Sequence, residues 1–106
     1  MPSDLDRLNL SVFSQYLNTH FNVRLDPATT IALELVTAVE RPTAPNFECF
    51  SVLFLGPESP YLGQGLRTIE HATLGTMDLF LVPVGKDARG VTYEAVFNRS
   101  RSDSRL

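Results

Sequence analysis

The strongest constraint on the fold is a series of short apolar stretches that fills the second half of the chain, from Phe47 to Asn98. Apolar, β-branched and aromatic residues make up these stretches, and glycine, proline and aspartate separate them. Segments of this length and composition, bounded by turn residues, are typical of an antiparallel sheet. The same half holds few side chains that could carry chemistry, so the pattern predicts a β-rich domain and says little about function.

The whole chain contains six predicted strands, two ahead of this half and four within it. Residues 21–25 alternate between apolar and polar, which indicates a half-buried strand. The turn that follows starts with Asp26 and Pro27, two residues that favour tight turns. Pro83 interrupts an apolar stretch, which places it at an edge or a bulge because proline donates no ladder hydrogen bond. The predicted strands are 21–25, 30–40, 47–55, 66–72, 77–83 and 91–98, with turns around Gly75 and over 85–90.

One helix is predicted ahead of the strands, over Leu10–Phe21. Ser11 is its expected N-cap, since a serine hydroxyl can accept a backbone N–H bond there. The helix is short, with two or three turns, and needs a sheet to lie on. Its apolar stripe at helical spacing consists of Val12, Phe13, Tyr16, Leu17 and His20.

This order of elements predicts a mainly β fold, an antiparallel six-stranded meander curled into a small barrel or roll, with one short N-terminal α-helix. A two-layer α+β arrangement is the alternative. The chain of 106 residues suits a single domain, which we assign to residues 1–98. Residues 99–106 are polar and rich in arginine and serine, and are predicted to be a disordered tail.

Composition excludes several classes of function. A net charge of −3 argues against nucleic-acid binding, which usually requires a basic patch. No apolar run approaches the roughly 20 residues of a membrane helix, so no membrane contact is expected. The first residues lack the pattern of an export signal, which predicts a cytoplasmic protein or a part of an assembly without its own signal peptide. The single cysteine, Cys49, rules out an intrachain disulfide and a thiol cluster for zinc, and no cofactor is expected.

Residues capable of acid–base or nucleophilic chemistry are few. His20 and His71 lack the spacing of metal ligands. His20 is expected at the helix end, and His71 just before a turn, where it can hydrogen-bond a backbone group. Cys49 lies in an apolar strand, where burial keeps a thiol unreactive. A hydrolase or isomerase would require Cys49, His71 and a carboxylate to converge.

Paired carboxylates could also support acid–base chemistry. Glu34 with Glu48, and Glu70 with Asp78, are the pairs that adjacent strands could bring together. Their expected outward direction favours solvated surface charges instead.

The irregular segment from Gly56 to Gly65 is the best candidate for binding. Two prolines stiffen it, and Tyr61 and Leu62 place an apolar pair at its tip. Exposed aromatic and apolar loop residues commonly mark a contact with another protein. The alternative is that this pair folds back as a lid over the end of the barrel. The predicted interaction residues are Pro57, Glu58, Pro60, Tyr61, Leu62 and Gln64.

Several sequence blocks, in order, resemble a bacterial family of uncharacterised small domains. That family carries F-S-x-L-F-x-G-P, then Q-G, L/I-E-H-x-x-L-G, L-F-L-V-P-V-G and Y-E-A-V-F-N. Its N-terminal part is similar too, with a short helix before Phe21–Leu25. The resemblance implies no catalytic residues, and it implies an occurrence beside phage-tail-collar-like and surface-fibre proteins. In this chain the blocks are Phe50–Pro57, Gln64-Gly65, Ile69–Gly75, Leu79–Gly85 and Tyr93–Asn98.

Together these observations predict a non-enzymatic structural or protein-interaction domain, an accessory subunit of a phage-tail-like or surface-fibre assembly. The expected partner is another protein, such as a tail-collar-like or fibre protein, and free sheet edges would allow homo-oligomers. The alternative is a small-molecule-binding barrel with the 56–65 loop as its lid. Its cavity would be lined by Phe50, Phe54, Phe80 and Phe97.

Overall fold

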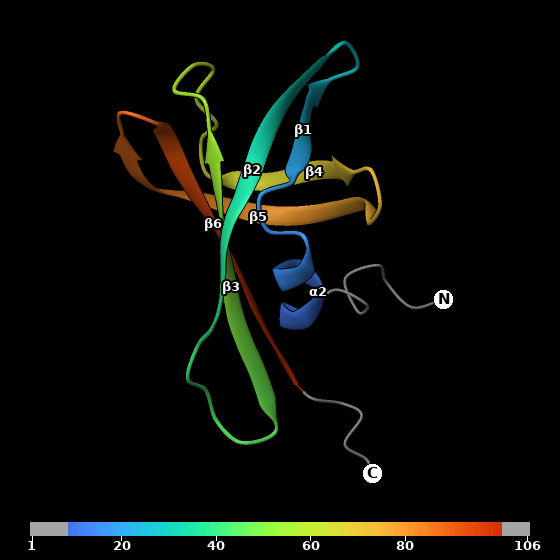
Figure 1. Ribbon diagram of the computed structural model, residues 1–106, viewed down its shortest axis with the longest axis vertical. Coiled ribbons are helices and arrows are strands. Elements are labelled where there is room, and N and C mark those ends of the chain that lie inside the picture. Colours follow the sequence, from blue (N-terminus) through green and yellow to red (C-terminus); the bar gives the residue numbers. More distant parts are fainter. Residues whose placement is uncertain (1–8, 101–106) are drawn as a thin grey trace.

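The structure is a computed structural model and describes residues 9–100, which form one short helix and six antiparallel strands (Figure 1). All six predicted strands are present, and most of them are longer than expected. The elements are α2 Leu10–Gln15, β1 His20–Asp26, β2 Thr29–Glu40, β3 Phe47–Gly56, β4 Gly65–His71, β5 Gly75–Asp87 and β6 Gly90–Ser100.

The strands close into a barrel in the order β1-β2-β3-β6-β5-β4. The barrel therefore consists of two three-stranded meanders, β1-β2-β3 and β4-β5-β6. One junction, between β3 and β6, is paired along the full length of β3. The other junction joins β1 to β4 through only two residue pairs, Asn22 with Glu70 and Val23 with Ile69. The predicted mainly β barrel is confirmed, and the two-layer alternative is wrong because the sheet curls back on itself.

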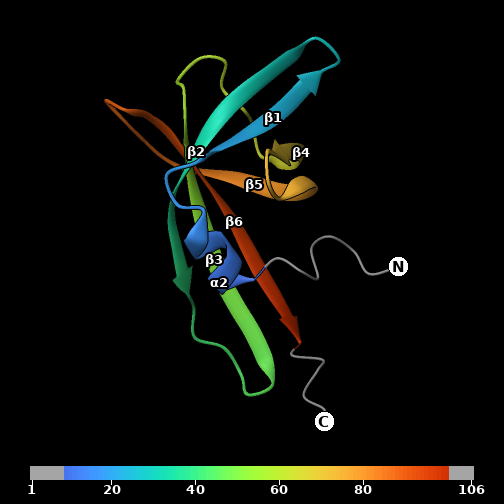
Figure 2. The ribbon, with the colours of Figure 1, turned by 45° about the vertical axis from the view of Figure 1, so that its right-hand side comes forward.

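The barrel is strongly splayed, so neighbouring strands separate beyond their paired segments. Figures 1 and 2 show β1 and β4 running apart at a steep angle, and β5 leaving β6 in the same way. Pairing between β5 and β6 ends at Val82 and Glu94. Beyond that point β2, β3 and β6 continue as a three-stranded extension. Whole edge strands were expected to be free, and ring closure corrects this. Among the described residues every strand has a neighbour on both sides, and only parts of strands lack a pairing partner on one side.

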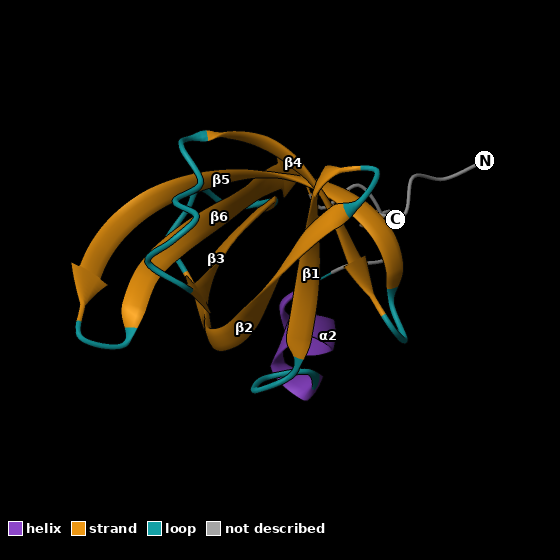
Figure 3. Ribbon diagram, turned by 90° about the horizontal axis from the view of Figure 1, so that it is seen from above, coloured by secondary structure: helices purple, strands orange, loops and turns teal. Residues whose placement is uncertain are grey.

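The helix α2 fills the space where the strands splay. It lies beside β1 and β2 (Figure 3), with its single fully buried side chain, Phe13, turned into the barrel. The Phe13 ring lies 5.4 Å from Phe97, 6.1 Å from Phe50 and 6.3 Å from Phe21, measured between ring centroids. One residue therefore contacts β6, β3 and β1 and seals this end of the barrel.

The helix is shorter than the predicted Leu10–Phe21, and its cap is different. Asn9 is the N-cap, and its side-chain oxygen accepts the backbone N–H of Val12 at 2.9 Å. The helix ends at Gln15 with Tyr16 as its C-cap, and Asn18, with a positive φ of 67°, lies in the turn that leads to β1. His20, expected at the helix end, already belongs to β1 and is exposed. Tertiary pairing decides this boundary, because the backbone of Thr19 accepts a hydrogen bond from Leu35 of β2.

The strands follow the predicted alternation apart from register shifts in β1, in β2 after Leu35 and near the end of β5. On β3, the inward residues Phe50, Val52 and Phe54 are fully buried, while Leu53 and Leu55 are half-buried. The shift in β5 follows Pro83, where the register between β5 and β6 changes. Leu81 is the last residue of β5 that pairs with β4, so Pro83 lies both at an edge and at a bulge, the two positions predicted for it.

The turn predicted over 85–90 is shorter than expected. Gly85 lies within β5, next to the bulge, and β5 continues to Asp87. The Asp87 carboxylate accepts the backbone N–H of Arg89 at 2.8 Å, which shapes the tight turn into Gly90.

The last strand also extends past its predicted end. Arg99 pairs with Glu48 and Ser100 with Phe47, so the first two residues of the predicted tail belong to β6. The rest of that tail, 101–106, and residues 1–8 of the predicted domain lie outside the described residues.

Replacing Phe13 tests how far the barrel depends on this ring. We expect Phe13→Ala to lower the free energy of unfolding by about 3–5 kcal/mol, because it leaves a cavity among three other rings. Urea denaturation followed by circular dichroism measures the change. Ser14→Ala, on the exposed side of the same helix, is the matched control. Its free energy of unfolding should stay close to that of the unmodified protein. A small loss for Phe13→Ala would show that α2 is not a structural plug.

Candidate protein-interaction surface

The loop between β3 and β4 covers the opposite end of the barrel. The two residues at its predicted tip, Tyr61 and Leu62, have different environments. Leu62 is buried, with 3% of its surface exposed, and its backbone N–H donates to the Tyr93 hydroxyl at 2.9 Å. Tyr61 is 61% exposed, and its ring lies 6.5 Å from that of Tyr93. Leu62 thus acts as the lid that the alternative interpretation expected, while Tyr61 remains available for contact.

Two side chains tie this loop to the strands beside it. Glu58 forms an exposed ion pair with Lys86 of β5 at 2.6 Å. Arg67 of β4 donates from Nη2 to the carbonyl oxygen of Gly63 at 2.9 Å. The loop is therefore held in place while most of it faces outward. Its exposed predicted residues are Pro57, Glu58, Pro60, Tyr61 and Gln64.

An apolar pair that the sequence interpretation did not select lies beside this loop. Leu66 of β4 and Phe80 of β5 are direct cross-strand partners on the outer face of the barrel. They are 67% and 51% exposed, respectively. Large apolar side chains that are this exposed and directly adjacent are a common sign of a contact surface. A signal existed in the sequence for Phe80: the run Leu79–Val82 is apolar on both faces, although only one face can line the core.

The first half of β4 also offers backbone groups for pairing. Residues 65–68 pair with β5 on one side, whereas β1 pairs with β4 only at Glu70 and Ile69. Within the described residues, this segment has no strand on its other side, and we call it the open edge of β4. We define the interaction surface as the 57–64 loop, the open edge and Phe80. An open edge next to exposed apolar residues is a suitable site for an added strand.

The short junction between β1 and β4 is supported by an ion pair. Arg24 donates to Glu70 at 2.6 Å across the junction. Both side chains are more than one-third exposed, so the pair contributes little stability. Glu70 and Asp78, which were considered as a carboxylate dyad, have separate partners, because Asp78 accepts a hydrogen bond from Thr68 at 2.9 Å.

His71 anchors a turn, as predicted. The backbone N–H groups of Thr73 and Leu74 donate to its Nδ1 at 3.0 and 3.1 Å. Because Nδ1 accepts, we assign the hydrogen to Nε2, which lies 3.0 Å from the Thr19 hydroxyl. That hydroxyl donates to the carbonyl of Tyr16 at 2.7 Å. The imidazole thus joins the β4–β5 turn to the segment between α2 and β1.

The electrostatics of this site favour a neutral imidazole. Burial lowers the pKa of His71 below its ordinary value of 6.5. Protonation would also place a hydrogen on Nδ1, where it would face the backbone N–H groups of Thr73 and Leu74. The ring contacts are aromatic, with Tyr16 at 5.0 Å and Phe21 at 4.4 Å between centroids. These contacts describe a structural histidine.

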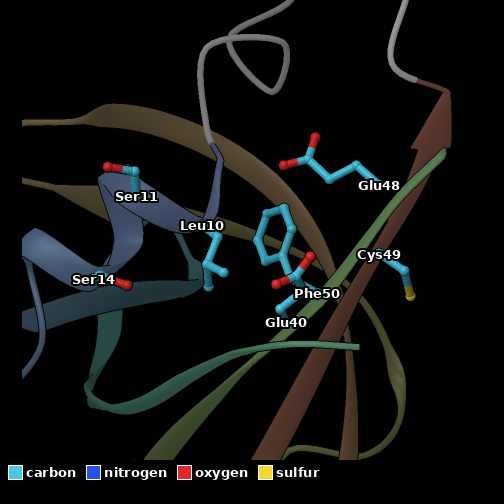
Figure 4. Close-up of a pocket in the computed structure, with 7 residues that line it drawn as sticks. All are labelled: Leu10, Ser11, Ser14, Glu40, Glu48, Cys49 and Phe50. Atoms are coloured by element: carbon cyan, nitrogen blue, oxygen red, sulfur yellow. The ribbon is translucent and has the colours of Figure 1, made fainter. Parts of the chain in front are cut away.

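Cys49 lies apart from this arrangement. In Figure 4 the Phe50 ring and the carboxylates of Glu40 and Glu48 lie on the side of β3 that faces α2, while the Cys49 sulfur points to the opposite side. A hollow of about 470 Å³ lies between α2 and this end of the sheet. Cys49 pairs in register with Asn98, and none of the hydrogen bonds of His71 involves Cys49 or a carboxylate in the described residues.

The acidic side of the hollow is partly neutralised. Arg99 donates to Glu48 at 3.2 Å, and Glu34 lies opposite Leu55, so the carboxylate pair considered for Glu34 and Glu48 does not form. The Arg99 guanidinium also lies over the rings of Phe50 and Phe97, at 5.7 and 5.8 Å from their centroids.

The interior of the barrel is occupied by side chains. Phe50 stacks on Phe97 at 4.6 Å, and Phe54 meets Phe21 edge-on at 5.2 Å, between centroids. Phe80, expected to line a cavity with Phe50, Phe54 and Phe97, instead lies on the outside. That expectation is wrong because β5 turns its even-numbered residues outward at this point.

The chain was also compared with known proteins. Residues 8–97 match the family described as Domain of unknown function (DUF6916). The chain belongs to this family. The match covers the helix, the six strands except the last residues of β6, and the whole interaction surface. Neither the curated proteins nor the solved structures give a match.

Two kinds of feature are missing from residues 9–100. This part of the chain contains no group of three or more histidine, cysteine, aspartate or glutamate residues placed to hold a metal ion. It also contains no helix that is long and apolar enough to span a membrane.

Substitutions at adjacent loop positions should separate the lid from the exposed contact residue. We expect Leu62→Ala to lower the free energy of unfolding by about 2–5 kcal/mol, because it empties a buried site. Tyr61→Ala, one residue away but exposed, should change it by less than about 0.5 kcal/mol. Urea denaturation measures both. Equal effects would mean that the loop does not seal the barrel through Leu62.

The stability of the protein should fall in mild acid because of His71. The unfolded chain binds a proton on this residue at a higher pH than the folded chain, so unfolding takes up a proton below pH 6.5. The contribution of neutral His71 to the free energy of unfolding is complete above pH 6.5. It is lost as the pH falls from there through the lowered pKa of the folded protein. Urea midpoints at pH 7.5 and pH 5 measure the slope. His71→Gln should flatten it, whereas His20→Gln, at an exposed position, should preserve it. An unchanged slope in His71→Gln would contradict the assignment.

Proposed function

We propose that this chain is a non-enzymatic protein-interaction domain. The observation that carries the proposal is the exposed cross-strand pair of Leu66 and Phe80 beside the open edge of β4. A partner that covers this pair would remove apolar surface from water, the main favourable term in protein association. Backbone groups of the open edge would add directional hydrogen bonds to a partner strand.

The loop supplies the remaining part of the surface. Tyr61 presents an aromatic ring with a polar hydroxyl, a combination enriched at interfaces. The Leu62 anchor and the hydrogen bond to Gly63 hold the loop in place, which lowers the entropy lost when a partner binds. A prearranged loop next to an open edge supports docking better than catalysis.

The resemblance of the sequence blocks suggests the kind of partner. We propose an accessory subunit of a phage-tail-like or surface-fibre assembly, with a tail-collar-like or fibre protein as the partner. The alternative, a small-molecule-binding barrel, has less support, because aromatic side chains occupy the interior and Leu62 closes the loop end.

Complex formation with the proteins encoded beside this chain tests the proposal. The purified chain is mixed with each neighbouring collar-like or fibre protein, and co-elution is measured by size-exclusion chromatography with light scattering. We expect a complex with one of them that Leu66→Asp or Phe80→Asp abolishes, because each places a charge in the apolar contact.

Val39→Asp is the matched control. Val39 is 43% exposed on β2, outside the interaction surface, so this variant should retain the complex. Thermal melts of all three variants check folding. The absence of a complex with every neighbouring protein would overturn the proposal, and so would equal binding by the three variants.

A further inference from the structure

Arg67 occupies an unusual position on the open edge of β4. It lies on the inner face, in register with Leu79, which is buried. Its neighbour Leu66 faces outward. Charged side chains are rarely placed toward an apolar interior unless they have a partner of opposite charge.

The hydrogen bonds of this guanidinium are incomplete. Nη2 donates to the carbonyl oxygen of Gly63 at 2.9 Å, but Nε is buried and has no hydrogen-bond partner. A guanidinium has five N–H donors, and a buried donor without an acceptor costs free energy. A buried polar atom left unpaired in a native fold requires an explanation.

The positive charge of Arg67 is also uncompensated within the described residues. The ion pairs between these residues do not include Arg67. The acidic residues of neighbouring elements have other partners: Glu58 pairs with Lys86, and Glu70 with Arg24. In the part of the chain that the structure describes, the mouth of the barrel under the loop therefore carries a positive charge without a counter-charge.

We propose that Arg67 receives the carboxylate of an acidic side chain from the protein that docks on the interaction surface. This inference rests on the proposed function and names the chemistry of its partner. The planar guanidinium matches a carboxylate, with two parallel N–H···O bonds. The 57–64 loop, whose Gly63 carbonyl already accepts a hydrogen bond from Arg67, would cover one side of the ion pair, and arginine often dominates the energy of an interface.

A partner side chain fits this site better than a free amphipathic acid. The acyl chain of such an acid would need space inside the barrel, where Leu62 closes the loop end and the rings of Phe21 and Phe54 are in contact. Arg67 is half-buried, so the carboxylate of an aspartate or glutamate needs to reach only the mouth of the barrel under the loop.

The site can be tested first on the chain alone. The buried Nε–H of Arg67 is a suitable NMR probe in protein labelled with ¹⁵N-arginine. We expect titration with sodium acetate to shift its resonance in a saturable way, and acetamide to leave it unchanged. The Nε–H of Arg24, whose Nη2 is already paired with Glu70, is the internal control. A resonance that does not respond to acetate, or that responds more strongly to inorganic phosphate, would overturn the proposal.

The complex provides the second test. We expect Arg67→Gln to weaken binding of the collar-like or fibre partner by at least about tenfold, the usual effect of losing a central interface arginine. Arg24→Gln should leave the affinity unchanged. Thermal melts establish that both variants fold.

The outcomes separate this inference from the proposed function. If Leu66→Asp abolishes the complex but Arg67→Gln binds normally, docking stands and the carboxylate site is overturned. If neither substitution affects binding, the interaction surface itself is wrong.

Discussion

A barrel of six strands has two ends, and this chain closes each of them with a different side chain. Phe13 enters one end from α2 and contacts rings on β1, β3 and β6. Leu62 enters the other end from the loop and is held there by the hydroxyl of Tyr93. Without these two residues the apolar interior would be open to water, so the placement of the helix and of the loop follows from this requirement.

The weak point of the barrel is its β1–β4 junction. Two residue pairs and an exposed ion pair are enough to close the ring, but they leave the first half of β4 paired on one side only. Leu66, Arg67 and the loop lie at this opening. The same splay that allows α2 to enter one end therefore exposes a backbone edge at the other. In this way the geometry of a small barrel produces a surface suited to another protein.

The strands could be predicted because their pattern is local. Alternation, turn residues such as Asp26 and the proline at the β5 bulge all depend on near neighbours in sequence. The turn-anchoring role of His71 was also predictable from its position before a turn. The helix boundary was not, because Thr19 is drawn into pairing with Leu35, a residue far along the chain. The interaction surface was only partly predicted, since Leu66, Arg67 and Phe80 were not selected.

Leu66 and Phe80 show why the surface required the structure. In the sequence they resemble the core residues beside them, and only the register between β4 and β5 places them together on the outside. Likewise, the sequence does not distinguish which of the neighbouring loop residues Tyr61 and Leu62 is buried. The Tyr93 hydroxyl, which accepts the backbone N–H of Leu62, decides it. The sequence by itself determined the number of strands and the mainly β class, because these depend on local periodicity. The ring order, the sealed ends and the open edge were decided by tertiary structure, because they depend on contacts between residues far apart in the chain.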